Sequence, residues 1–338
     1  MRLLICIAVS ALGLTLATSA ARADDVRVIV GFKGKAAKSV VEEHGGRCRG
    51  VVGRAVVATL PARKIAALRA SSAVAYVEED VIVEVAGRTK ADNPNKGNGR
   101  TKTKPTPDEP TPDESTDPEP TPTDPEPTPA PPDPVDITKP SSPASSSGHA
   151  SETTPWGVTK VDAPSAAYTG KGVKVAILDS GIDVDHPDLW ANIGPMHDFV
   201  GTTAEDGHGH GTHVAGTVAA VSNTIGCVGI APEATLYVGR VLDDNGSGYA
   251  SDTAAAIRWA TQHKVHVVNM SLGIASNNSA VASACSDAES AGILLIAAAG
   301  NGGDGKLSTN ETLYPGSLSS CVAVGATDSS DRLASWSN

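Results

Sequence analysis

The chain has 338 residues and a formal net charge of −11, with 27 basic and 38 acidic side chains. Its length favours at least two folded units over one compact domain. Ten of the acids, and no Lys or Arg, lie in residues 105–136, so 28 acids against 27 bases remain elsewhere. The folded parts are therefore close to neutral, and no cluster of basic side chains on a predicted domain supports nucleic-acid binding.

The first 23 residues have the pattern of a secretory signal peptide. A basic residue, Arg2, precedes an apolar run from Leu3 to Ala17, and the small residues Ala21 and Ala23 stand where a signal peptidase cleaves. An uncleaved anchor is the alternative, but the run is shorter than the roughly 20 residues that span a bilayer. No later stretch of the sequence is long and apolar enough to span a bilayer. We therefore expect cleavage after Ala23, no membrane span after signal removal, and a secreted protein, extracellular or periplasmic.

Residues 24–88 are the first predicted domain, a small α+β unit. β-branched runs alternate there with stretches of helical spacing. In chain order we predict a strand at 26–30, a helix at 36–44, a strand at 51–60, a helix at 62–70 and a strand at 74–85 that is interrupted at 78–80. With about 60 residues the unit is near the lower limit of independent stability, and none of its residues indicates catalysis.

Residues 89–150 are predicted to be a disordered linker rich in Pro, Thr, Asp and Glu. Fifteen of the 23 prolines lie between Pro105 and Pro143. Such a segment cannot bury an apolar core, and its prolines and like charges keep it extended. A glycosylated, mucin-like stalk is the alternative, because the segment is rich in threonine.

Residues 151–338 form the second predicted domain, in which strands and helices alternate. In chain order we predict a strand at 173–178, a helix at 210–221, a strand at 234–242, a helix at 251–263, a strand at 265–270, a helix at 280–291, and strands at 293–298 and 321–326. Strands joined by crossover helices imply an α/β fold, with a parallel sheet between helices. Functional residues of such sheets lie at the carboxyl ends of the strands.

Polar residues typical of catalysis fall at such strand ends. Asp179 directly follows the strand 173–178, and three histidines, His208, His210 and His213, stand at the start of the helix 210–221. Three imidazoles within one turn could hold a metal ion. They could instead include a catalytic base at a helix N-terminus, or be a structural cluster. A metalloenzyme is less favoured, because no carboxylate stands at helical spacing as in zinc hydrolases.

Four motifs in this order give a specific resemblance. They are Asp179–Asp183 (DSGID), His210–Thr217 (HGTHVAGT), Asn269–Gly273 (NMSLG) and Ala297–Asn301 (AAAGN). With them the chain resembles the subtilisin-like serine peptidases, the subtilases, from Trp156 to Asn338, and more loosely the unit at 26–87 resembles the inhibitory propeptide of that family. The resemblance implies a three-layer α/β catalytic domain with a parallel sheet, at 151–338, preceded by an α+β propeptide at 24–88.

The resemblance also implies roles for individual residues. Asp179 would orient the imidazole of His210, which would act as general base and acid, and Asn301 would donate its amide to the oxyanion. Two edges would bind the backbone of an extended substrate. One edge with the floor of the first pocket would comprise Ser271, Leu272, Gly273, Ala298, Ala299 and Gly300, and the other edge would comprise Gly246, Ser247 and Gly248. The partners would be protein or peptide substrates and the chain's own propeptide as intramolecular inhibitor, in a monomer.

One part of the family pattern is missing. The nucleophilic serine of the family lies in a Gly-Thr-Ser-x-Ala segment, and these 338 residues contain none. Ser335 and Ser337 have the wrong neighbours for that role. We expect a fragment of a longer secreted endopeptidase zymogen whose serine lies beyond Asn338. The alternative is a truncated, inactive product whose propeptide unit binds a peptidase in trans.

Calcium is the cofactor that the resemblance implies. A carboxylate, an amide and backbone carbonyls of one loop would bind it. The ligands would be Asp188, Asn223, Glu152 and the carbonyl groups of Val221, Ile225 and Cys227. A loop that closes without an ion is the alternative. Because Glu152 matches a ligand near the mature N-terminus, processing is expected before it.

Four cysteines follow the signal peptide, and secretion would expose them to an oxidising environment. Cys285 and Cys321 fall on a helix and a later strand of the same predicted sheet, so a disulfide between them is plausible. Cys227 can instead be a buried apolar filler. If Cys48 is removed by processing, three cysteines remain and at least one is free or paired elsewhere.

Overall fold

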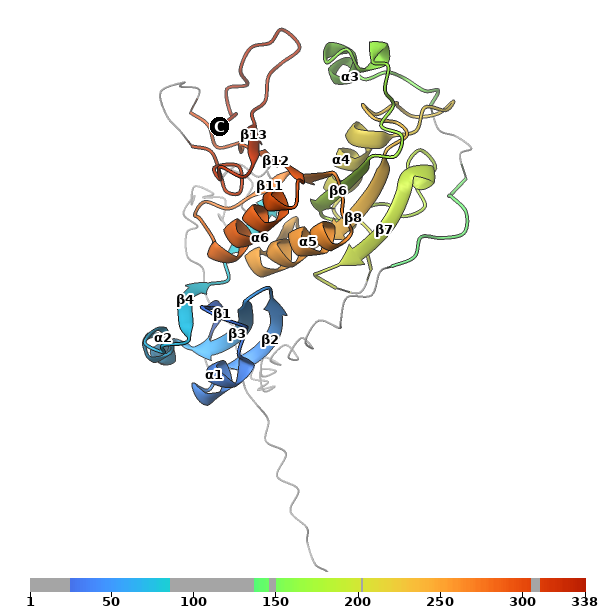
Figure 1. Cartoon of the computed structure of the whole chain (residues 1–338). Helices are drawn as coiled ribbons and strands as arrows, with labels where there is room; N and C mark the ends of the chain where they lie inside the picture. The colour runs from blue at the N-terminus through green and yellow to red at the C-terminus, as the bar shows by residue number, and fades with distance from the viewer. Residues whose placement is uncertain (1–24, 86–136, 146–149, 202, 305–310) are drawn as a thin grey trace, which may run out of the picture.

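The computed structural model describes residues 25–85, 137–145, 150–201, 203–304 and 311–338 (Figure 1). The predicted signal peptide and most of the predicted linker lie outside these residues. The described chain forms a small N-terminal unit and a larger unit, and the smaller one lies beneath helices α5 and α6 of the larger one in Figure 1.

The N-terminal unit is a four-stranded antiparallel sheet with two short helices. Its elements are β1 (Asp25–Phe32), α1 (Lys38–Glu43), β2 (Arg47–Val52), β3 (Ala55–Pro61), a 3₁₀ turn (Ala62–Lys64), α2 (Ile65–Arg69) and β4 (Val74–Glu79), with strand order β2-β3-β1-β4. Val41 of α1 and Leu68 of α2 are fully buried against the sheet, in a core with Val28, Val30 and Leu60. The prediction of a small α+β unit is confirmed.

One predicted strand of this unit was wrong. Residues 51–60 form no single strand, because the chain reverses between β2 and β3 and the two strands pair antiparallel. Gly53 permits this turn, since it adopts a φ of +60° that other residues avoid. The turn was not predicted because apolar, β-branched residues lie close to Gly53 on both sides, as in a continuous strand.

The last predicted strand of the N-terminal unit divides into two strands that belong to different sheets. β4 completes the small sheet, whereas β5 (Ile82–Val85) leaves it. β5 pairs antiparallel with β9 (Ser247–Tyr249) on one side and β11 (Leu272–Gly273) on the other. The N-terminal unit therefore contributes the central strand of a sheet whose two edge strands come from the larger unit.

The larger unit is built on six strands in the order β13-β12-β10-β6-β8-β7, all paired in parallel. Its strands are β6 (Lys174–Asp179), β7 (Ile193–Asp198), β8 (Thr235–Arg240), β10 (Val267–Met270), β12 (Leu294–Ala298) and β13 (Val322–Val324). Its helices are α3 (Trp156–Lys160), α4 (His210–Ala219), α5 (Ala250–Gln262) and α6 (Ser279–Ser290), with 3₁₀ turns at Ala163–Ser165 and Trp190–Asn192.

Alternation along the central strand explains the three layers. Val175 and Ile177 of β6 pack with the small side chains of α4, whereas Ala176 and Leu178 pack with α5 and α6. Successive side chains of a strand point to opposite faces, so a strand with apolar residues at every position needs cover on both sides. The predicted fold class, a parallel sheet between two helical layers, is confirmed.

The last part of the predicted linker contacts the larger unit. Ile137 donates a backbone hydrogen bond of 2.7 Å to Met196 of β7, and the indole of Trp190 donates one of 3.1 Å to the carbonyl of Pro140. Residues 137–145, which the linker prediction included, thus lie against the sheet of the larger unit. Strand β7 itself was missed, because Gly194 and Pro195 interrupt its apolar pattern.

Candidate active site

Asp179 and His210 meet at the carboxyl edge of the parallel sheet. Asp179 is the last residue of β6 and His210 is the first residue of α4, and Asp179 Oδ1 lies 2.7 Å from His210 Nδ1. Asp179 is fully buried, and the backbone N–H of Ser180 donates a second hydrogen bond of 2.8 Å to the same oxygen. The hydrogen bond that His210 donates to Asp179 raises the pKa of His210, although burial acts in the opposite direction. The imidazole is thereby oriented and made more basic.

Asp206 fixes the loop that leads into His210. Its Oδ1 accepts hydrogen bonds from the hydroxyl of Ser180 and from the backbone of His208 and Gly209, at 2.8–3.1 Å, and its Oδ2 accepts two from Thr212. Burial acts to raise the pKa of Asp206, but the hydrogen bonds from Thr212, Gly209 and Ser180 outweigh it and leave the pKa below its usual value. We did not single out Asp206 in the sequence. The sequence offered one signal for this role, because Asp206 lies four residues before the histidine that begins the helix.

Gly211 lets α4 approach the strand end closely. A Cβ atom at this position would lie 2.2 Å from the carbonyl oxygen of Gly181, which is backbone and cannot swing aside. The spacing of the motif His210-Gly211-Thr212 therefore has a packing cause, since any side chain at Gly211 would push His210 away from Asp179.

The three histidines do not gather around one point. The ring centroids of His208 and His210 are 6.2 Å apart, and His213 is exposed on the next part of α4. Among the described residues, no group of three or more His, Cys, Asp or Glu side chains is placed to hold a metal ion. The geometry thus gives a three-histidine metal site no support, and it pairs His210 with a carboxylate instead.

Strand β5 lies between the two edges that the sequence assigned to substrate. Glu84 pairs with Ser247 on one side and Gly273 on the other, and Val83 and Val85 pair with Gly248 and Leu272. The backbone N–H of Val85 also donates a 3.0 Å hydrogen bond to the carbonyl of Gly246. Both valines are buried while Glu84 is exposed. The two edges therefore pair with the backbone of the extended strand β5 and enclose its alternate side chains.

Asn301 and the preceding small residues follow β12 at the same edge of the sheet. Ala298 ends β12, Ala299 bonds through its backbone to Leu313 and Val324, and the carbonyl of Gly300 accepts a 3.0 Å hydrogen bond from the backbone of Asn338. Ser271, just before β11, accepts a 3.0 Å hydrogen bond from Asn269. These residues lie at the same carboxyl edge as Asp179. The backbone hydrogen bonds given above for Ala299 and Gly300 are formed with residues 313, 324 and 338, and not with β5.

Ser337 has a structural position. Its residue is 4% exposed, and its hydroxyl accepts a 2.8 Å hydrogen bond from the backbone N–H of Ala326. The hydroxyl of Ser337 is thus used to hold the backbone at Ala326.

Three of the predicted calcium ligands, Glu152, Asp188 and Asn223, contact the loop that follows α4. Residues 150–153 pair with residues 224–227, and this pairing places the carboxylate of Glu152 in hydrogen-bond contact with the backbone N–H of Asn223. Asn223 donates a 2.8 Å hydrogen bond to Asp188, whose other carboxylate oxygen accepts one of 3.0 Å from the backbone of Cys227. Burial and the charges of Asp188 and Glu152 raise the pKa of the Cys227 thiol. The carboxylates of Glu152 and Asp188 and the amide of Asn223 are thus held together at one loop, and carboxylate oxygens are ligands that a hard cation prefers.

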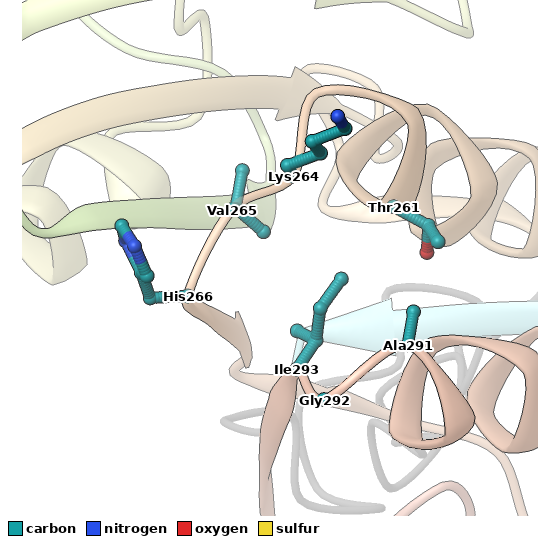
Figure 2. Close-up of a pocket in the computed structure, with 7 residues that line it drawn as sticks. All are labelled: Thr261, Lys264, Val265, His266, Ala291, Gly292 and Ile293. Carbon is teal, nitrogen blue, oxygen red and sulfur yellow. The ribbon is translucent and has the colours of Figure 1, made fainter.

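A surface pocket lies away from all these residues (Figure 2). It opens where the chain leaves α5 and α6 and enters β10 and β12, which is the amino edge of the sheet. Its lining is Thr261, Lys264, Val265, His266, Ala291, Gly292 and Ile293. Because Asp179 and His210 lie at the opposite edge, we assign this pocket no part in their chemistry. In the described part of the chain, no helix has the length and apolar character that crossing a membrane requires.

Comparisons with known proteins agree with the fold and with the motifs. The family model described as "Subtilase family" matches residues 170–338. Subtilisin Savinase of Lederbergia lenta is 46% identical over 191 residues, which cover 55% of this chain and 68% of that protein. An alkaline protease of Alkalihalobacillus alcalophilus is 46% identical over 191 residues, and subtilisin E of Bacillus subtilis (strain 168) is 45% identical over 193. The chain spans about half the length of these last two, at 48% and 50%.

The family match, the parallel sheet between two helical layers and the relatives at 44–46% identity all point the same way. The chain belongs to the subtilase family of serine endopeptidases.

Proposed function

We propose that the protein is a secreted serine endopeptidase that is made as a zymogen and hydrolyses peptide bonds in unfolded segments of proteins. The observation that carries this proposal is the 2.7 Å pair of Asp179 and His210 at the carboxyl edge of the sheet. His210 takes the proton of a serine hydroxyl as general base and returns it to the leaving amine, while Asp179 holds the imidazole and stabilises its cation. Asn301 donates its amide to the oxyanion. The serine belongs to a Gly-Thr-Ser-x-Ala segment that these 338 residues do not contain.

The proposed domain boundaries follow from this function. Residues 1–23 are the signal for secretion, 24–88 the propeptide, 89–150 a linker whose last residues contact the larger unit, and 151–338 a part of the catalytic domain that acts as a monomer. The propeptide inhibits by occupying the cleft with β5, because β9 and β11 pair with its backbone as they would with a substrate. The same contact would let the unit bind a related peptidase in trans, which is the alternative function for a product without a serine.

The test of the proposed function compares two lengths of the protein. A reading frame that continues into a Gly-Thr-Ser-x-Ala segment should give a protein that hydrolyses casein after maturation, whereas the 338 residues alone should release no peptides above background, because they hold the base without its nucleophile. Hydrolysis by the 338 residues that Asp179→Asn abolishes would overturn this assignment of roles. A continuing frame without activity, in a folded protein, would favour the inhibitory alternative.

The pH profile of the mature enzyme gives a second test. Only the neutral imidazole of His210 can accept the serine proton, and the hydrogen bond that His210 donates to Asp179 raises the pKa of His210. Activity should therefore increase as pH rises through that raised pKa, and it should be lost below it. The variant Asp179→Asn removes the carboxylate that raises the pKa of His210. The acid limb of kcat/KM should therefore shift to lower pH in this variant, while the maximum value of kcat/KM falls. An acid limb at the same pH in both proteins would mean that another group limits the rate.

We also propose that calcium stabilises the loop of Asp188 and Asn223. Glu152, Asp188, the side-chain oxygen of Asn223 and the carbonyls of Val221, Ile225 and Cys227 would hold the ion. The observation that supports this is the convergence of two carboxylates, one of them almost fully buried, on a single loop. When bound, the ion would offset their charge and tie residues 150–153 to α4.

Removal of calcium by a chelator should lower the melting temperature of the wild-type protein. Chelation should lower the melting temperature of the variant Asp188→Asn by a smaller amount. Isothermal titration should show one calcium ion bound by the wild type and weaker binding by Asp188→Asn. The variant Asp243→Asn, which removes a carboxylate from a turn elsewhere in the domain, serves as the control and should bind like the wild type. Equal titration curves for Asp188→Asn and wild type would reject the site.

A further inference from the structure

Two cysteines of the larger unit lie in one apolar cluster. Cys285 is fully buried on the inner face of α6, among the side chains that cover the sheet. Cys321, which directly precedes β13, is partly buried and packs against the same cluster. Their positions follow from the topology, because β13 pairs with β12 and α6 packs on β12. The other two cysteines among the described residues are placed elsewhere, with Cys48 in β2 and Cys227 in the loop after α4.

The two side chains also contact each other. The interaction between the two thiols raises the pKa of Cys285 and lowers the pKa of Cys321. Ser320 adds a hydrogen bond that also lowers the pKa of Cys321, whereas burial and the charge of Glu289 act against it. Cys321 is therefore the more readily ionised and the more exposed of the two sulfurs, and a thiolate is the form that attacks a disulfide.

We propose that Cys285 and Cys321 form a disulfide bond in the mature protein, which ties helix α6 to the edge strand β13. The inference rests on the proposed secretion for its oxidising environment, and on the packing of the two residues for its geometry.

The bond forms by exchange with a disulfide oxidant, either a small-molecule disulfide or that of a thiol oxidoreductase. The thiolate of Cys321 attacks one sulfur of the oxidant, forms a mixed disulfide and releases the other sulfur as a thiolate. Cys285 then loses its proton and attacks the sulfur of Cys321, which releases the second thiolate. The two cysteines together lose two electrons and two protons, and the disulfide of the oxidant is reduced to two thiol groups.

The loop that this bond closes contains part of the proposed active site. Residues 285–321 include the second half of α6, all of β12, and Gly300 and Asn301. The outer strand β13 has little other anchorage, since Val322 and Val324 are each about half exposed. A cross-link at Cys321 would therefore restrain the edge strand that hydrogen-bonds to Ala299, and it would reduce the freedom of the unfolded chain.

Peptide mapping tests the proposal without any need for peptidase activity. The folded chain is equilibrated with reduced and oxidised glutathione, its free thiols are alkylated, and the digest is analysed by mass spectrometry without reduction. We expect a linked pair of peptides that contain Cys285 and Cys321, with Cys48 and Cys227 alkylated. Alkylation of both Cys285 and Cys321 in the folded protein, or linkage of either to another cysteine, would overturn the proposal. Because the assay supplies the oxidant, its outcome is independent of whether the protein is secreted or active.

Thermal unfolding supplies a second readout. Reduction with dithiothreitol should lower the Tm of the oxidised protein by about 10 °C. The double variant Cys285→Ala/Cys321→Ala should melt near the reduced wild type and should not respond to dithiothreitol. The variant Cys48→Ser is the matched control and should respond like the wild type. If the double variant still lost Tm on reduction, or the wild type did not, the bond would not exist in the folded protein.

Discussion

Replacement of His210 by alanine should reduce kcat of the complete, mature enzyme by about 10⁶-fold, the size of the loss that removal of the catalytic histidine causes in subtilisin itself. The reason is that the serine would lose the base that accepts its proton and the acid that protonates the leaving amine. KM should change little, because β9 and β11 bind the substrate backbone and do not include His210. The measurement is steady-state hydrolysis of a peptide substrate by both proteins.

The control for this result is another histidine of the same helix. His213 lies three residues further along α4 and is exposed, so His213→Ala should retain kcat within a factor of about two if it is only a surface residue. Circular dichroism should show that both variants are folded. A loss of less than 100-fold in His210→Ala would contradict its role as general base, and an equal loss in His213→Ala would point to disruption of α4 instead.

The pairing of Asp179 with His210 was predicted from the resemblance to the subtilases. The residue pattern by itself placed a carboxylate at a strand end and histidines at a helix start, on the carboxyl edge of a parallel sheet, and it left a metal site and a structural cluster open as alternatives. The layers of the larger unit needed only local patterns, since alternating strands and helices with apolar residues at every strand position leave few other arrangements.

Other features depend on contacts between distant segments, which local patterns do not reveal. Nothing in the residues 82–85 by themselves shows that they leave their own sheet and pair with residues more than 160 positions away. The role of Asp206 arises only when the turn before α4 lies beside Ser180. Strand β7 was missed because Pro195 and Gly194 break its pattern, and an edge strand tolerates them where a central strand would not.

The contact between the N-terminal unit and helices α5 and α6 is another feature that depends on distant segments. The carboxylate of Asp80 is fully buried and accepts hydrogen bonds from Arg27, at 2.6 Å, and from the backbone and hydroxyl of Ser251, at 2.9 and 2.7 Å. Ser251 is the second residue of α5, whose own N-cap side chain forms no capping bond. In the same way Glu78 accepts two hydrogen bonds from Ser279, the first residue of α6. Two acids of one short segment thus cap two adjacent helices, where the helix dipoles favour negative charge.

The variant Asp80→Asn should therefore weaken binding of the propeptide unit to the mature catalytic domain by about 100-fold. The substitution keeps the shape of the side chain but leaves Arg27 without its closest carboxylate and removes the charge at the start of α5. Between the two units, the carboxylate of Asp80 accepts hydrogen bonds from the backbone and hydroxyl of Ser251. A hydrogen bond to a charged group contributes about 1.5–3 kcal/mol, and the asparagine oxygen can still accept one of the two, which gives a loss of about 100-fold. The measurement is the inhibition constant of residues 24–88 toward the complete, mature enzyme, with circular dichroism to compare the folding of both propeptides.

Glu79 is the control for charge alone. It lies between Glu78 and Asp80, it is exposed, and Glu79→Gln removes the same unit of charge from the same segment. If the capping contact determines the affinity, Glu79→Gln should change the inhibition constant by less than about threefold, because exposed charges contribute little, whereas Asp80→Asn should change it by about 100-fold. Raising the salt concentration should leave the gap between the two variants nearly unchanged, since a buried contact is weakly screened. Equal effects in both variants, or a gap that disappears in high salt, would mean that long-range attraction and not the cap of α5 holds the propeptide in the cleft.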